Sequence, residues 1–174
     1  MTLLSEPLSI YLNDHLTGAF AGTALARRMA DTHPDSRRAA ELRQLARDVE
    51  QDRDILVRIM NNLAVPVRRY RTWLGIAGER IARLKLNGAL TRRSPLSDLI
   101  ELEGMRTGVE GKTALWQALR TIADNDPRLD PDELDRLIDR AEVQTRTLNR
   151  WHQAVSAEVL NGRQPAPREE TDTL

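Results

Sequence analysis

Two polar residues interrupt otherwise apolar stripes of this sequence, and they are the first candidates for chemistry. Asp52 lies in a stripe that runs over residues 42–63, and Gln144 lies in a stripe over residues 134–155, each with spacings of three and four residues. Such spacing places a whole stripe on one face of a helix. A buried carboxylate or amide is costly unless it is paired, so we expect each residue to have a polar partner inside the fold.

The turns of two predicted helical hairpins indicate which residues these partners are. Counting back from the first turn places Asp52 level with His15, and counting back from the second places Gln144 level with Glu110. We interpret His15–Asp52 and Glu110–Gln144 as hydrogen-bonded pairs that fix the helix register, as buried polar residues do in coiled coils. The alternative is one iron, manganese or zinc ion held by His15, Asp52 and Glu110, since one imidazole and two carboxylates form a suitable ligand set.

A further polar group surrounds Glu110 on its own helix. Glu103, Arg106 and Glu110 stand at positions i, i+3 and i+7, so the Arg106 guanidinium faces both carboxylates. Bidentate pairing with arginine satisfies a carboxylate without a metal ion. We therefore predict neither a catalytic residue nor a bound cofactor.

Proline, glycine and capping residues divide the chain into five predicted helices, over about 8–31, 35–63, 67–86, 95–123 and 131–160. Asp130 precedes Pro131, Asp132 and Glu133, a pattern typical of a capped helix N-terminus. Short connections predict two antiparallel hairpins, joined by a crossover over residues 64–95. This crossover contains a fifth, shorter helix, the one predicted over about 67–86. The sequence thus predicts one all-α four-helix-bundle domain over residues 1–160 and a disordered tail over 161–174.

Glycines within two of the predicted helices need a physical reason, because each costs about 1 kcal/mol relative to alanine. They are Gly18, Gly22, Gly104, Gly108 and Gly111. Our first interpretation is close packing between the hairpins, in which case Gly108→Leu would destabilise the protein by about 1–3 kcal/mol. The alternative is a pocket for a small organic ligand.

This helix order, with polar residues at mid-bundle, resembles the ferritin-like di-iron carboxylate proteins, in which each hairpin supplies a Glu from one helix and a Glu-x-x-His from the next. The resemblance covers residues 8–160. The positions that match Glu-x-x-His are Val49 and Asp52 on one helix and Ala141 and Gln144 on another, while Glu110 keeps its type. The resemblance implies a degenerate member of this superfamily that has lost the dimetal site.

Composition excludes several classes of function. The chain has no cysteine and a formal net charge of zero, which excludes disulfides and thiolate chemistry and gives no general attraction to nucleic acid. No apolar run approaches the roughly 20 residues of a membrane span, and the N-terminus lacks the features of a signal peptide. We therefore expect a cytoplasmic protein without a membrane span.

The predicted crossover is basic. Its cationic residues are Arg68, Arg69, Arg71, Arg80, Arg83, Lys85, Arg92 and Arg93. We interpret this patch as a solvated face or a contact for a protein partner, because no nucleic-acid-binding motif accompanies it.

The sequence therefore predicts a non-catalytic, ferritin-like binding or assembly module, whose partner is another protein or a second copy of itself. Two alternatives stay open. One is a mononuclear-metal or redox protein that uses the mid-bundle set of His15, Asp52 and Glu110. The other is a carrier of a small apolar molecule, which requires a cavity between the first and fourth predicted helices.

Overall fold

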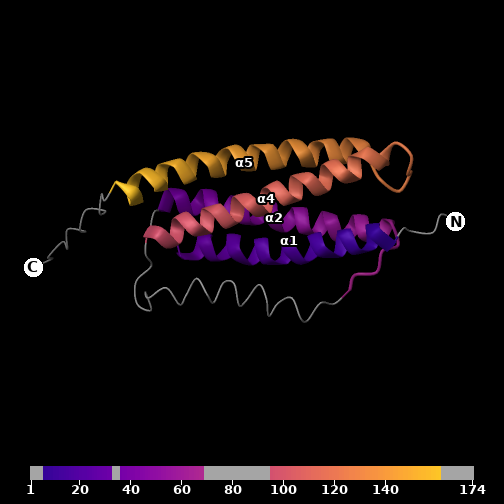
Figure 1. Cartoon of the computed structure of the whole chain (residues 1–174), viewed down its shortest axis with the longest axis horizontal. Coiled ribbons are helices and arrows are strands. Elements are labelled where there is room, and N and C mark those ends of the chain that lie inside the picture. The colour runs from indigo at the N-terminus through magenta and orange to yellow at the C-terminus, as the bar shows by residue number, and fades with distance from the viewer. Residues whose placement is uncertain (1–5, 33–35, 69–94, 162–174) are drawn as a thin grey trace, which may run out of the picture.

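A computed structural model describes residues 6–32, 36–68 and 95–161 of the chain. These residues form four helices and no strand: α1 (Glu6–Thr32), α2 (Ser36–Asn62), α4 (Pro95–Ala123) and α5 (Pro131–Leu160) (Figure 1). The prediction of an all-α chain is confirmed for the described part. The predicted short helix over 67–86 and the predicted tail fall almost entirely outside the described residues, and Val67 and Arg68, which are described, are not helical.

The helix ends follow the local chemistry of the sequence. The Asp130 side chain accepts hydrogen bonds from the backbone N of Asp132 at 3.0 Å and of Glu133 at 3.2 Å, which confirms the predicted cap of α5. Helix α2 ends where Ala64 adopts a positive φ of 57° and the backbone N of Val65 donates to Met60 O at 2.8 Å. This left-handed residue closes the last turn of the helix.

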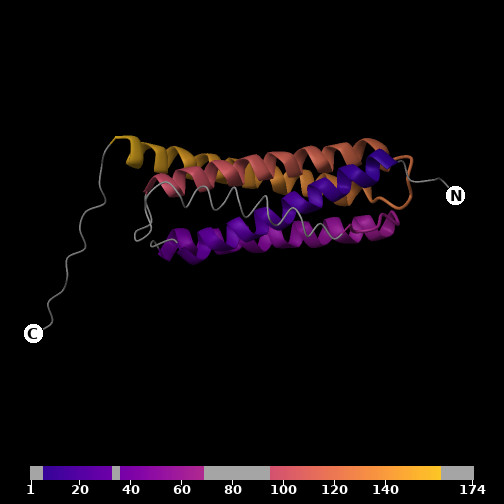
Figure 2. The ribbon, with the colours of Figure 1, turned by 60° about the horizontal axis from the view of Figure 1, so that its bottom comes forward.

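The four helices form two antiparallel hairpins, α1 with α2 and α4 with α5, and α1 lies beside α4 (Figures 1 and 2). Helix α2 ends next to the start of α1, whereas α4 starts at the opposite end of the bundle (Figure 1). The connection between α2 and α4 therefore joins opposite ends of the bundle.

Asn13 fixes the start of that connection to α1. Its side chain is buried, its Oδ1 accepts from the backbone N of Arg68 at 2.8 Å, and its Nδ2 donates to Pro66 O at 3.2 Å. One buried amide thus satisfies both a backbone donor and a backbone acceptor of residues that follow α2.

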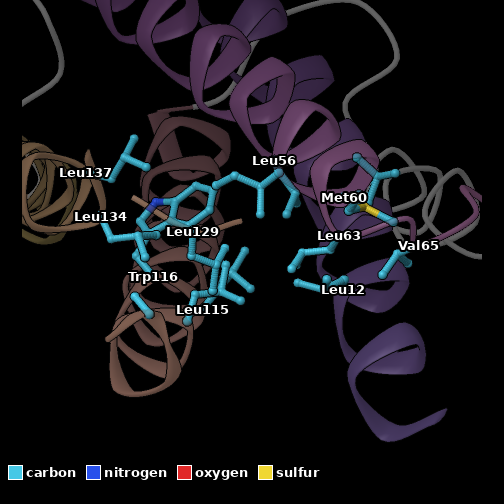
Figure 3. Close-up of a cluster of buried hydrophobic side chains, with 14 residues drawn as sticks. Leu12, Leu56, Met60, Leu63, Val65, Leu115, Trp116, Leu129, Leu134 and Leu137 are labelled. Carbon is cyan, nitrogen blue, oxygen red and sulfur yellow. The ribbon is translucent and has the colours of Figure 1, made fainter. Parts of the chain in front are cut away.

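The core consists of two apolar clusters along the bundle axis. One surrounds the α4–α5 turn and includes Leu56, Leu115 and Trp116 (Figure 3), and the other includes Val49 and Val109 and occupies the opposite half. All apolar members of the predicted α2 stripe are buried, as are those of the α5 stripe except the half-buried Trp151. The boundary between the clusters falls between residues 49 and 56 of α2, which is where Asp52 lies.

Candidate functional site

Asp52 is the centre of the polar group between the two clusters, with only 3% of its surface exposed. Lys112 Nζ of α4 lies 2.5 Å from Asp52 Oδ2, and Arg140 Nη2 of α5 donates to Asp52 Oδ1. The carboxylate is thus held by two cations from two other helices. The expectation of a buried, paired carboxylate is confirmed, but its predicted pairing with His15 is wrong.

Gln144 belongs to the same group. It is 5% exposed, and its Oε1 accepts from Lys112 Nζ at 2.5 Å. The predicted Glu110–Gln144 pair is therefore also wrong. We call Asp52, Lys112, Arg140 and Gln144 the polar layer. It joins α2, α4 and α5, and a charge-assisted network of this kind replaces the two separate hydrogen-bonded pairs that we expected.

The polar layer has more hydrogen-bond donors than acceptors. Arg140 Nη1 reaches Gln51 Oε1 at 3.0 Å, but Arg140 Nε and Gln144 Nε2 have no partner among the described residues. The Lys112 ammonium has three donors, and two of them are used by Asp52 and Gln144. The layer therefore lacks acceptors.

His15 lies near Asp52 without bonding to it. Its ring packs edge-to-face on Tyr11 with centroids 4.5 Å apart, and it lines the same cavity as Asp52. Partial burial lowers the pKa of His15, against the opposing effect of Asp14. The imidazole is consequently neutral near pH 7.

Glu103, Arg106 and Glu110 do not join the polar layer. Glu110 is exposed and lies 3.9 Å from Arg106 Nη2, while Glu103 Oε1 lies 3.1 Å from His152 Nε2 of α5. The predicted Arg106 bridge reaches Glu110 only loosely. Glu110 lines a separate surface depression between α4 and α5, and it does not line the cavity that contains His15 and Asp52.

This arrangement does not assemble the predicted metal ligands. Within residues 6–32, 36–68 and 95–161, no group of three His, Asp or Glu side chains is placed to hold a metal ion. Asp52 is instead occupied by Lys112 and Arg140. Of the predicted basic patch only Arg68 is described, and it is exposed; the other members fall outside the described residues.

The helical glycines surround open space and do not form a close helix contact. A Cβ added at Gly18, Gly108 or Gly111 would meet nothing within 4 Å, and at Gly104 it would make an ordinary contact of 3.5 Å with Leu25. The interpretation of these glycines as a tightly packed seam is therefore wrong, and so is the expected overpacking by Gly108→Leu. Two facing helices that carry no side chains at these positions leave a gap between them.

That gap is a cavity of about 300 Å³ between α1 and α4, with α2 behind it. All five helical glycines line it, and we call it the glycine-lined cavity. Its apolar walls are Ala19, Val49, Leu56, Met105, Val109, Leu115 and Trp116. Its polar groups are Asp14, His15, Asp52, Arg53 and Lys112. The volume lies at the lower end of the roughly 300–1,000 Å³ that is usual for small-molecule sites, and mainly apolar walls with few polar groups are typical of them.

Lys112 makes the stability of the protein depend on pH below the ordinary pKa of lysine. Burial lowers the pKa of Lys112, and the nearby Asp52 only partly offsets this effect. Between this lowered pKa and the ordinary lysine value the unfolded chain binds more protons, so the free energy of unfolding should rise with pH. Urea unfolding of wild type and Lys112→Met at several pH values checks this: the rise should be absent in the variant. Parallel curves for the two proteins would contradict it.

Comparisons with protein-family models, with curated proteins and with solved structures found no match to this chain. No described helix combines the length and the apolar character that crossing a membrane requires. The class of the protein is therefore given by its own geometry: an all-helical chain with a buried polar layer and a glycine-lined cavity.

Proposed function

We propose that this chain is a non-catalytic binding module, and that a small, mainly apolar molecule binds in the glycine-lined cavity. The observation that carries the proposal is the cavity itself, about 300 Å³ between α1 and α4 with largely apolar walls. The short, long, short order of its connections also supports a ferritin-like bundle without a dimetal site. A protein partner or homodimer and a cytoplasmic location stay predictions.

The glycines support a binding role because packing does not require them. Alanine at Gly108 or Gly111 would gain about 1 kcal/mol of helix propensity, and its Cβ would meet no neighbouring atom within 4 Å. Glycine at several such positions lowers the stability of the helices although packing does not require it. Departures of this kind from local stability are expected at functional sites. Here the exceptions gather around one cavity.

The pairing of Asp52 supports binding over catalysis. Each oxygen of the Asp52 carboxylate is engaged by a cation, Lys112 on one and Arg140 on the other, and these two positive charges disfavour a metal ion at the same group. Lys112 and His15 line the cavity beside it. These groups are placed to orient a ligand, since a few polar groups in an apolar pocket serve that purpose.

Titration with 1-aminoanthracene, a neutral apolar dye whose fluorescence increases in apolar surroundings, tests the proposal. The wild-type protein should bind the dye saturably at one molecule per chain. Gly108→Leu should weaken binding by about tenfold or more because leucine fills the cavity. Ala118→Leu is the matched control, since Ala118 is exposed on the same helix and does not line the cavity. Equal binding to all three proteins, or none to wild type, would refute the proposal.

A further inference from the structure

The polar layer at the back of the glycine-lined cavity is unbalanced in charge. Lys112 and Arg140 contribute two positive charges, and among the described residues Asp52 is the one carboxylate bonded to them. The Asp52, Lys112 and Arg140 side chains are 3%, 14% and 28% exposed, so water compensates the ammonium of Lys112 less than the guanidinium of Arg140. Asp48 on α2 also acts on Lys112, but only through its electrostatic field, and it is half-buried and bonded to Gln44.

The polar layer also has more hydrogen-bond donors than acceptors. Lys112 has a third ammonium hydrogen beyond those used by Asp52 and Gln144, and Lys112 lines the cavity. Arg140 Nε and Gln144 Nε2 also lack acceptors among the described residues. A buried donor without an acceptor is costly. A bound acceptor that carries negative charge would offset the excess charge and accept from Lys112, the one of these three residues that lines the cavity.

From this geometry we infer that the ligand of the cavity is a small apolar molecule that ends in a carboxylate, and that Lys112 Nζ binds this carboxylate. The inference rests on the proposed function and adds the chemical class of the ligand. The apolar part lies against Val109, Leu115 and Trp116, which line the cavity on the same helix as Lys112. One carboxylate matches the single excess charge and takes the donor that Asp52 and Gln144 leave unused.

Competition between the bound dye and two probes of equal chain length tests the inference. Octanoate and octan-1-ol differ in the headgroup and share the apolar chain. Octanoate should displace 1-aminoanthracene at a concentration about tenfold or more below that of octan-1-ol, since charge-assisted hydrogen bonds are the stronger ones. Equal displacement by both probes would overturn the carboxylate and leave the proposed function intact. Failure of the dye and of both probes to bind would overturn both.

Lys112→Met is the variant that isolates the ammonium group. Methionine keeps an apolar wall of similar length, and Asp52 keeps Arg140 as its partner, so we expect the variant to fold. It should still bind the dye and octan-1-ol, but the preference for octanoate should fall to about one. An unchanged preference would assign the carboxylate to another group and overturn the inference.

The pH dependence of the wild type provides a second readout that needs no variant. Octanoate should bind more weakly as pH rises through the lowered pKa of Lys112, because the ammonium group loses its charge when it becomes an amine. Octan-1-ol should show no such change. The other charged or titratable groups around Lys112 are Asp14 and His15 from α1, Asp48, Asp52 and Arg53 from α2, and Arg140 from α5. His15 is already neutral at pH 7, so an octanoate affinity that does not change over this range would contradict the inference.

A second copy of this chain is the other occupant that the cavity could take. It would exclude both probes, and sedimentation would then depend on protein concentration. That combination of results would also overturn the carboxylate ligand.

Discussion

Replacing Asp52 with alanine should destabilise the protein by about 3–5 kcal/mol, because the change leaves two partly buried cations without their shared carboxylate. Asp52 is 3% exposed and bonds Lys112 and Arg140 at once. Each cation would then have to draw in water or lose its proton, and arginine does not lose its proton in proteins. Urea unfolding followed by circular dichroism measures the loss.

Two other substitutions distinguish this mechanism from a general effect of mutating α2 or the polar layer. Asp48→Ala removes a carboxylate one turn earlier on α2 that is half-buried and, among the described residues, accepts from Gln44 alone, so it should cost under about 1 kcal/mol. Lys112→Met removes one of the two cations, and Asp52 keeps Arg140; it should cost much less than Asp52→Ala. A loss for Asp52→Ala as small as that for Asp48→Ala would show that the buried charges are not held by Asp52.

Local pattern was sufficient to predict most of the helices. The ends of α4 and α5 agree with the predicted limits 95–123 and 131–160, because proline begins both helices and turn-forming residues follow α4. The interior positions of Asp52 and Gln144 followed from the apolar stripes that contain them. These features depend only on residues close in sequence, which is why the sequence alone predicts them.

The partners of Asp52 depend on how two hairpins meet, and counting across a turn carries an error of about one helical turn, or roughly four residues. Lys112 lies two residues from Glu110, which we had predicted. A usable signal was present, since Leu102, Met105, Val109, Lys112, Trp116 and Leu119 follow the same spacing of three and four. That stripe marks Lys112 as an inward-facing cation. The signal for Arg140 was weaker, because it only flanks Ala141, and its length lets the guanidinium reach α2.

The glycines show a different limit of prediction from sequence. A small residue on a helix face suits a close contact and an open cavity equally well, so Gly108 or Gly111 alone does not distinguish them. The distinction depends on the distance between α1 and α4, which is set by larger residues elsewhere in the bundle. The structure decides it, since a Cβ at either position would meet nothing within 4 Å.

Trp116 carries the second large effect that we expect. Its side chain is 1% exposed, and Figure 3 shows its indole among leucine side chains in the cluster around the α4–α5 turn. Trp116→Ala should destabilise the protein by about 3–5 kcal/mol, the usual cost of removing a buried aromatic side chain. Thermal or urea unfolding measures this loss. A loss below about 1 kcal/mol would contradict the placement of Trp116 in the core.

Phenylalanine at the same position should behave differently, because Trp116 Nε1 is buried and has no hydrogen-bond partner among the described residues. Trp116→Phe keeps an aromatic ring in the cluster and removes this unpaired donor, so the lost packing is offset by relief of roughly 1–3 kcal/mol. Trp151 provides the contrast, since its Nε1 donates to Glu41 Oε2 at 3.1 Å. Trp151→Phe breaks a hydrogen bond that exists and leaves Glu41 without this donor. Per unit of buried ring area that is lost, Trp116→Phe should therefore lower the free energy of unfolding less than Trp151→Phe does. The opposite order would mean that the Trp116 indole donates a hydrogen bond in solution.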